Sequence, residues 1–239
     1  MAGAQPYFLG ARFEQLISKL ETPSDERMVM TVRVERATSQ EKMAVIRRLI
    51  GQLLDQGMRD MKVREFTIGL VRESGLPWNT GQKPYLSQLR WLHNWFTEHA
   101  VYQHDAAGTE QLSTARATLF RNSGTPGVPL EDCDGLSLCL ASMLGGIGYR
   151  PAVLLVDTDG SGVLSHAMVG VKTPMARRYQ LHNPRPEIPG PPLITWNGTK
   201  QWLPLEVTKG QARADGKYGP GWLPPKTSVV IPITANDRF

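Results

Sequence analysis

The sequence feature that most constrains the fold of this chain is a cysteine at the start of a predicted apolar helix. The segment Glu131–Leu144 reads E-D-C-D-G-L-S-L-C-L-A-S-M-L, and its apolar residues recur at helical spacing after Asp132, a residue type that favours the N-cap. The glycine cluster at 145–148 is predicted to end this helix. Cys133 then lies in the first turn, where the helix dipole favours a thiolate.

Two observations weigh against a nucleophile at Cys133. Asp132 and Asp134 flank the thiol and raise its pKa unless a nearby cation compensates their negative charges. Most free cysteines are also simply small, buried apolar residues. The nucleophile hypothesis therefore depends on a histidine that another part of the chain must supply.

Two strand-like segments supply that histidine and a carboxylate. Ser165–Val171 and Trp202–Thr208 each alternate between two faces, as strands with one packed face do. His166 shares its face with Met168, and Glu206 shares its face with Trp202. We expect Glu206 to accept a hydrogen bond from one ring N–H of His166, which fixes the tautomer and stabilises the imidazolium. The opposite, packed faces comprise Ala167, Val169 and Val171 in the first strand and Leu203, Leu205 and Val207 in the second.

These motifs, in this order, resemble the transglutaminase-like superfamily. D-C-D at a helix start, S-H-A on a strand and W-L-P-L-E-V-T on a later strand are similar to its Cys, His and Asp motifs, over about residues 85–210. More narrowly, the chain resembles short transglutaminase-like proteins encoded in phages and prophages. It departs from the family pattern in having Glu131 for Gly, Gly135 for Asp, Met168 for an aromatic residue and Glu206 for Asp.

The resemblance implies an α+β fold with a papain-like core, in which the helix bearing the cysteine packs on an antiparallel sheet. It also implies thiol-dependent acyl transfer on an amide, with Cys133 as nucleophile, His166 as acid and base, and Glu206 orienting the imidazole. Water as acceptor would make the protein a cysteine protease or amidase, and an amine would make it a transglutaminase. The expected partner is a peptide or protein substrate.

A second hypothesis comes from a different class of function. In it the protein is a phage or prophage structural or assembly protein that keeps the same core as a scaffold or uses it in particle maturation. Phage structural proteins or further copies of the chain would then be its partners. The expected location is the cytoplasm of a bacterial host or the virion.

The oxyanion formed in acyl transfer needs hydrogen-bond donors. The backbone N–H of Cys133 is one, because first-turn amides have no acceptor within their helix. Tyr102, Asn122 and Gln103 are the candidates, in that order, for the second donor.

Composition excludes several other classes of protein. The 239 residues carry a net charge of +5 without any run of five like charges, so neither nucleic acid nor a membrane surface is an expected partner. No apolar stretch reaches the ~18 residues of a membrane span, and residues 1–10 lack the pattern of a signal peptide. Cys133 and Cys139 lie on different faces of one helix and should not form a disulfide, which suits a reducing compartment.

No cofactor or metal is expected either. Cys133, His166 and Glu206 are not spaced as short ligand pairs. The acidic turn at 157–162 resembles the start of a calcium loop, but Met168 stands where an EF-hand needs its twelfth-position glutamate. His93, His99, His104 and His182 are interpreted as surface or hydrogen-bonded histidines.

The chain is expected to have three parts. Residues 1–37 form an arm and a strand (Met28–Val34) that pairs with a partner or, alternatively, is an edge strand of the same domain. Residues 38–84 form a helical lead-in, an antiparallel helix pair that packs on the core or, alternatively, is a separate docking module. Its first helix is capped by Thr38 and Glu41 and ends at Gly57, and its second runs from Asp60 to Gly75. Residues 85–239 form the catalytic core.

Within that core, one helix and two further strands are expected, at Tyr85–His99, Arg150–Val156 and Ser228–Ile233. Thr118–Leu130 is interpreted as the loop that delivers the chain to Cys133. The proline-rich segment Asn183–Pro192 is interpreted as a stiff connector, with a role in lining the substrate groove as the alternative.

Overall fold

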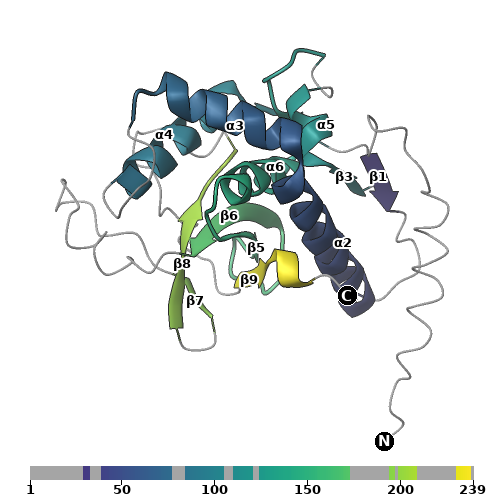
Figure 1. The fold of residues 1–239 in the computed structure, drawn as a ribbon. Coiled ribbons are helices and arrows are strands. Elements are labelled where there is room, and N and C mark those ends of the chain that lie inside the picture. The colour runs from purple at the N-terminus through teal and green to yellow at the C-terminus, as the bar shows by residue number, and fades with distance from the viewer. Residues whose placement is uncertain are drawn as a thin grey trace, which may run out of the picture.

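The computed structural model describes residues 29–32, 39–76, 84–104, 110–120, 124–172, 194–196, 199–208 and 230–237 (Figure 1). The helices are α2 (Ser39–Arg59), α3 (Met61–Glu73), α4 (Pro84–His99), α5 (Ala115–Phe120), α6 (Cys133–Gly146) and the 3₁₀ helix η1 (Ala235–Asp237). The strands are β1 (Val29–Val32), β2 (Val101–Tyr102), β3 (Glu110–Ser113), β4 (Leu130–Glu131), β5 (Pro151–Val156), β6 (His166–Lys172), β7 (Ile194–Trp196), β8 (Thr199–Leu205) and β9 (Val230–Ile233).

A five-stranded sheet forms the base of the fold. Its strand order is β7-β8-β6-β5-β9, and every neighbouring pair is antiparallel. Strands β5, β6 and β9 lie close to the predicted segments, so the chain has the mixed α+β architecture that the sequence predicts.

The sheet buries both of its faces, and the alternation along its strands decides which side chain goes where. One face packs against the helices and includes Val153, Val169 and Leu205. The other face forms a smaller cluster of Ala152, Leu154, Val156, Met168 and Trp202. The separation of Val169 and Leu205 from Met168 and Trp202 agrees with the two faces predicted for β6 and β8.

Helix α6 lies over the sheet and is the centre of the main core (Figure 1). Residues 134–144 are all buried, as expected of a helix that is apolar on every side. The helix ends in a Schellman motif, in which Gly148 has a φ of +96° and Tyr149 donates its N–H to the Leu144 carbonyl over 3.1 Å. The glycine cluster thus ends the helix as predicted, although Gly145 and Gly146 still belong to it.

Helices α2 and α3 each pack on α6, and they are not the antiparallel pair that the sequence predicts. A single residue, Asp60, separates them, which is too short for a helical hairpin, and they run in clearly different directions (Figure 1). The carboxylate of Asp60 caps α3 by accepting the Val63 N–H over 3.1 Å. It also forms an ion pair with Arg116 of α5 at 2.7 Å.

Gly57 does not end α2, which continues to Arg59. A Cβ at position 57 would lie 2.7 Å from the Cβ of Ser142, because α2 and α6 approach closely there. Gly145 on α6 has a similar reason, since a Cβ there would overlap the side chain of Met58. These glycines therefore permit close helix packing rather than a turn.

Two small sheets flank the core. Strand β1 pairs antiparallel with β3, with Val29 opposite Ser113, so within the described residues it is an edge strand of the same molecule, as one of the two alternatives held. Strand β2 pairs in parallel with β4, which directly precedes Asp132. The predicted loop 118–130 is wrong at both ends, because α5 extends to Phe120 and β4 begins at Leu130.

Several predicted features lie outside the described residues, among them the arm before β1, the cap at Thr38 and the proline-rich segment 183–192. Within the part of the chain that the structure describes, no helix is both long and apolar enough to cross a membrane.

Candidate active site

Cys133 is the first residue of α6, as predicted. The Asp132 carboxylate caps the helix by accepting the N–H groups of Asp134 and Gly135, over 3.2 and 3.3 Å. These capping bonds use the N–H groups of Asp134 and Gly135 and not that of Cys133, which is the amide that an oxyanion would use. The Cys133 side chain is partly exposed and packs against the edge of the main core.

The sulfur of Cys133 lies against strand β6. The backbone of Ala167, the residue after His166, hydrogen-bonds to it. Strand β6 pairs with β8 only from Val169 onward, so this position of β6 lies beyond that ladder. The thiol thus lies beside the segment that carries the predicted histidine, but among the described residues no hydrogen bond joins Cys133 to the His166 side chain itself.

The pKa of the Cys133 thiol is raised far above its usual value. Burial is the largest cause, and the charges of Asp134, Asp132 and Glu206 add to it, while the Ala167 hydrogen bond lowers it only in part. The two flanking acids thus act as the sequence predicts, and together with burial they favour the thiol over the thiolate. The resting side chain is a neutral thiol near pH 7.

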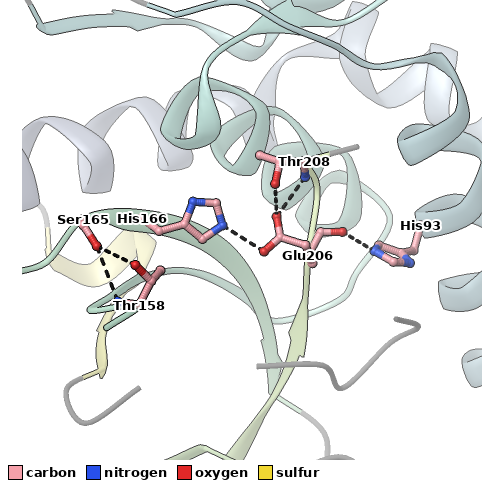
Figure 2. A network of polar contacts seen from close by, with 6 residues as sticks. All are labelled: His93, Thr158, Ser165, His166, Glu206 and Thr208. Carbon is pink, nitrogen blue, oxygen red and sulfur yellow. Dashed lines mark hydrogen bonds and ion pairs between the residues drawn. The ribbon is translucent and has the colours of Figure 1, made fainter. Parts of the chain in front are cut away.

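The hydrogen bond predicted between His166 and Glu206 is present. The Nε2 of His166 lies 2.8 Å from the Glu206 Oε2 (Figure 2). Since a carboxylate only accepts, Nε2 carries the proton, and Nδ1 holds the lone pair in the neutral ring. Nδ1 is therefore the nitrogen available as a base.

Register explains how Glu206 reaches His166. Val169 pairs with Leu205, and continuing that register places Glu206 opposite Met168, two residues from His166 on the same face. Such diagonal neighbours are ~7–8 Å apart in their backbones, within reach of a long side chain. Glu206 itself follows the last residue of β8, so the prediction that it lies within the strand is wrong by one residue.

Glu206 is held at three places. Its Oε1 accepts the backbone N–H and the hydroxyl of Thr208, over 2.8 and 2.6 Å. Its backbone carbonyl lies 2.5 Å from the Nε2 of His93 on α4, on the side away from His166 (Figure 2). The residue is 1% exposed.

These contacts decide the charge of Glu206. Burial raises the pKa of its carboxyl, but the hydrogen bond and charge of His166 and the two hydrogen bonds from Thr208 outweigh it, so the pKa lies below its usual value. Glu206 is a buried carboxylate near pH 7 and can stabilise a positive His166.

The two ends of the turn before His166 are joined by hydrogen bonds between Thr158 and Ser165. The hydroxyls of Thr158 and Ser165 lie 3.0 Å apart, and the Thr158 N–H donates to the Ser165 hydroxyl over 3.4 Å (Figure 2). Because Ser165 immediately precedes β6, these contacts hold the chain where it enters the strand that carries His166.

Positions 131 and 135 form one packing contact. A Cβ at Gly135 would lie 2.9 Å from the Glu131 Cβ, so the larger residue at 131 requires the smaller one at 135. The Glu131 side chain is buried and accepts a hydrogen bond from the Ser113 hydroxyl.

Two of the three oxyanion candidates lie beside the strand that leads to Cys133. Tyr102 pairs with Glu131, and the backbone N–H of Gln103 donates to the Glu131 carbonyl over 3.0 Å. Tyr102 is 38% exposed, and its ring meets His104 edge-on. Asn122 lies outside the described residues, so the choice of a second donor stays a prediction.

Sequence reasoning assigned no role at the site to His93 or Thr208. Thr208 had a local signal, since it follows Glu206 by two residues within the quoted W-L-P-L-E-V-T motif. His93 lies 113 residues before Glu206 and had none. Among the described residues, no group of three or more His, Cys, Asp or Glu side chains could hold a metal ion.

The fold and the site together define a mixed α+β protein with a thiol at a helix start and an imidazole–carboxylate pair at the adjoining strand ends. In comparisons with protein families, curated proteins and solved structures, no match to the chain is found. Its function is therefore argued from these residues alone.

Proposed function

We propose that this protein catalyses thiol-dependent acyl transfer on an amide substrate, using a papain-like, transglutaminase-like core. Cys133 is the nucleophile, His166 is the general base and acid, and Glu206 orients the imidazole. The observation that carries the proposal is the hydrogen-bonded pair of His166 and Glu206, with the Cys133 sulfur against the residue next to His166.

The raised pKa of Cys133 fits a mechanism in which the proton leaves as the nucleophile attacks. The Nδ1 of His166 takes the thiol proton while sulfur bonds to the amide carbonyl carbon, and the Cys133 N–H stabilises the resulting oxyanion. The carbon–nitrogen bond then breaks, and His166 returns the proton to the leaving amine. Buried Glu206 stabilises the imidazolium between these two steps.

The thioester formed on Cys133 is resolved by a second acceptor. His166 takes a proton from water or from a primary amine as it attacks the thioester, and then returns that proton to the departing sulfur. Water gives a carboxylic acid, as in a protease or amidase, and an amine gives a new amide, as in a transglutaminase. Hydrolysis is the outcome we favour for a site open to water.

One observation favours a second function, that of a phage or prophage structural or assembly protein. Burial and three carboxylates all raise the pKa of the Cys133 thiol, which is the setting of an unreactive cysteine. In this alternative, the His166–Glu206 pair is a structural contact that holds β6 and the end of β8 together.

Alkylation of Cys133 separates the two functions. We expect His166 to accelerate the modification of Cys133 by iodoacetamide near pH 7.5, so that His166→Ala slows the reaction by about 10²-fold. Modification is followed by mass spectrometry of the peptide that contains Cys133. Cys139, which is fully buried in the same helix, is an internal control, and Cys133→Ser isolates its background rate.

Equal rates for the wild type and His166→Ala, with both proteins folded, would favour the structural function. If His166 does accelerate the reaction, digestion of a peptide mixture with and without a primary amine identifies the acceptor. New carboxyl termini indicate hydrolysis, and amine incorporation at glutamine indicates transfer.

A further inference from the structure

The main chain of Glu206 lies at the end of its strand, outside the ladder of strand hydrogen bonds. Strand β8 ends at Leu205, so the Glu206 carbonyl lies just beyond the paired residues of the sheet. Thr208, which binds the carboxylate, follows two residues later in the same segment. Those two hydrogen bonds are local, whereas the bond to His166 and the buried side chain of Val207 join the segment to the rest of the molecule.

His93 provides a contact from another element. It lies on α4, is 3% exposed, and its Nε2 is 2.5 Å from the Glu206 carbonyl oxygen. Because a carbonyl only accepts, Nε2 must carry a proton and donate it. The contact therefore joins α4 to the end of β8 at the residue that holds His166.

The surroundings of the other ring nitrogen, Nδ1, also favour the tautomer of His93 that carries its proton on Nε2. Nδ1 is buried and has no hydrogen-bond partner among the described residues. A proton on Nδ1 would leave a buried donor unpaired, which is unfavourable. Burial also lowers the pKa of His93, although the hydrogen bond and charge of Glu206 oppose this. A neutral ring protonated on Nε2 satisfies the site best.

We propose that His93 is a positioning residue, whose Nε2–H fixes the Glu206 main chain and thereby holds the carboxylate against His166. This inference deepens the proposed function and depends on it for its effect on catalysis. His93 touches no reacting atom in this arrangement and acts only through Glu206. Small misplacements of such groups cost about 10²-fold in rate.

Two amide variants test the role of the Nε2 donor. In His93→Gln the side-chain amide nitrogen can take the place of Nε2, whereas in His93→Asn it reaches only the place of Nδ1. We expect His93→Gln to keep the alkylation rate of Cys133 within about threefold of the wild type, and His93→Asn to lower it about 10- to 100-fold.

The Nε2–H proton of His166, followed by NMR of labelled histidine, reports its hydrogen bond to Glu206 and does not need activity. We expect its resonance to move in His93→Asn toward its position in Glu206→Gln, because the carboxylate is no longer held in place, and to stay near the wild-type position in His93→Gln. Tyr149→Phe is the matched control, since it removes a hydrogen bond between Tyr149 and Gln88 on α4 without touching Glu206. It should lower stability without moving the Nε2–H resonance of His166.

Two results would overturn the inference. One is a folded His93→Asn protein in which the Nε2–H resonance of His166 and the alkylation rate both match the wild type. The other is a wild-type His93 that carries its proton on Nδ1, which nitrogen chemical shifts report even if His93→Asn does not fold. Failure of the proposed function looks different, because His166→Ala would then leave alkylation unchanged while the NMR results still decide the role of His93.

Discussion

Glu206 shows how one residue can carry charge into the core. A buried carboxylate is unfavourable unless hydrogen bonds compensate its lost hydration. Here His166 and Thr208 supply three hydrogen bonds to the two carboxylate oxygens. The length of the glutamate side chain suits the diagonal approach to His166 across the register of β6 and β8.

Glu206→Gln should make stability depend less on pH. The pKa of Glu206 in the folded protein lies below its usual 4.5, so the folded state binds the proton less readily than the unfolded state. Its stabilisation is therefore present above about pH 4.5 and is lost as pH falls through the folded pKa. We expect the variant to be about 1.5–3 kcal/mol less stable at pH 7.

Urea unfolding between pH 3 and 7 measures this effect as the difference between the two proteins. The difference should shrink as the pH falls below 4.5. A difference that stays constant over the whole range would mean that the carboxylate's charge is not what stabilises the fold.

At the scale of elements, long periodic segments were predicted well and short ones were missed. Helices α3, α4 and α6 lie close to their predicted bounds, because many apolar residues at helical spacing define each of them. Strands β2 and β4 have only two residues each, which is too few to show a period. Gly57 was misinterpreted because a glycine at a helix end and one at a helix contact look alike in sequence.

Gly57→Ala tests the packing of α2 on α6. Alanine favours a helix by about 1 kcal/mol over glycine, but here its Cβ would overlap Ser142. We expect a net destabilisation of about 1–3 kcal/mol in chemical denaturation.

Gly69→Ala on α3 is the matched control, because a Cβ there meets nothing within 4 Å. This substitution should stabilise the protein by about 0.5–1 kcal/mol. Equal stabilisation by both alanines would show that α2 and α6 do not approach as closely as described.

At the scale of the whole molecule, the lead-in helices and the sheet share one hydrophobic core. Leu53 of α2, Val71 of α3 and Ile233 of β9 belong to the same buried cluster as α6. An ion pair between Arg47 of α2 and Asp237 of η1, at 3.0 Å, joins two distant parts of the sequence. Residues of the helices and of the sheet are therefore buried in the same core, so each should contribute to the stability of the other.

This shared core predicts a single cooperative unfolding transition. Far-UV circular dichroism, which reports mainly the helices, and tryptophan fluorescence should give the same urea midpoint, because the helices and one face of the sheet are buried in the same main core. Leu53→Ala on α2 should shift both midpoints together, at a cost of about 2–5 kcal/mol. Two separate transitions would instead indicate an independent docking module.

The sequence alone determined the helix that carries Cys133, the alternation of the strands that carry His166 and Glu206, and the effect of the flanking acids on the thiol. All of these depend on neighbours within a few residues, where period, capping and charge act directly. Only the tertiary structure decided that β1 pairs with β3, that Gly57 serves a helix contact and that His93 anchors Glu206. Such contacts join residues far apart in the chain, and side-chain type alone does not specify which distant partner packing will bring into reach.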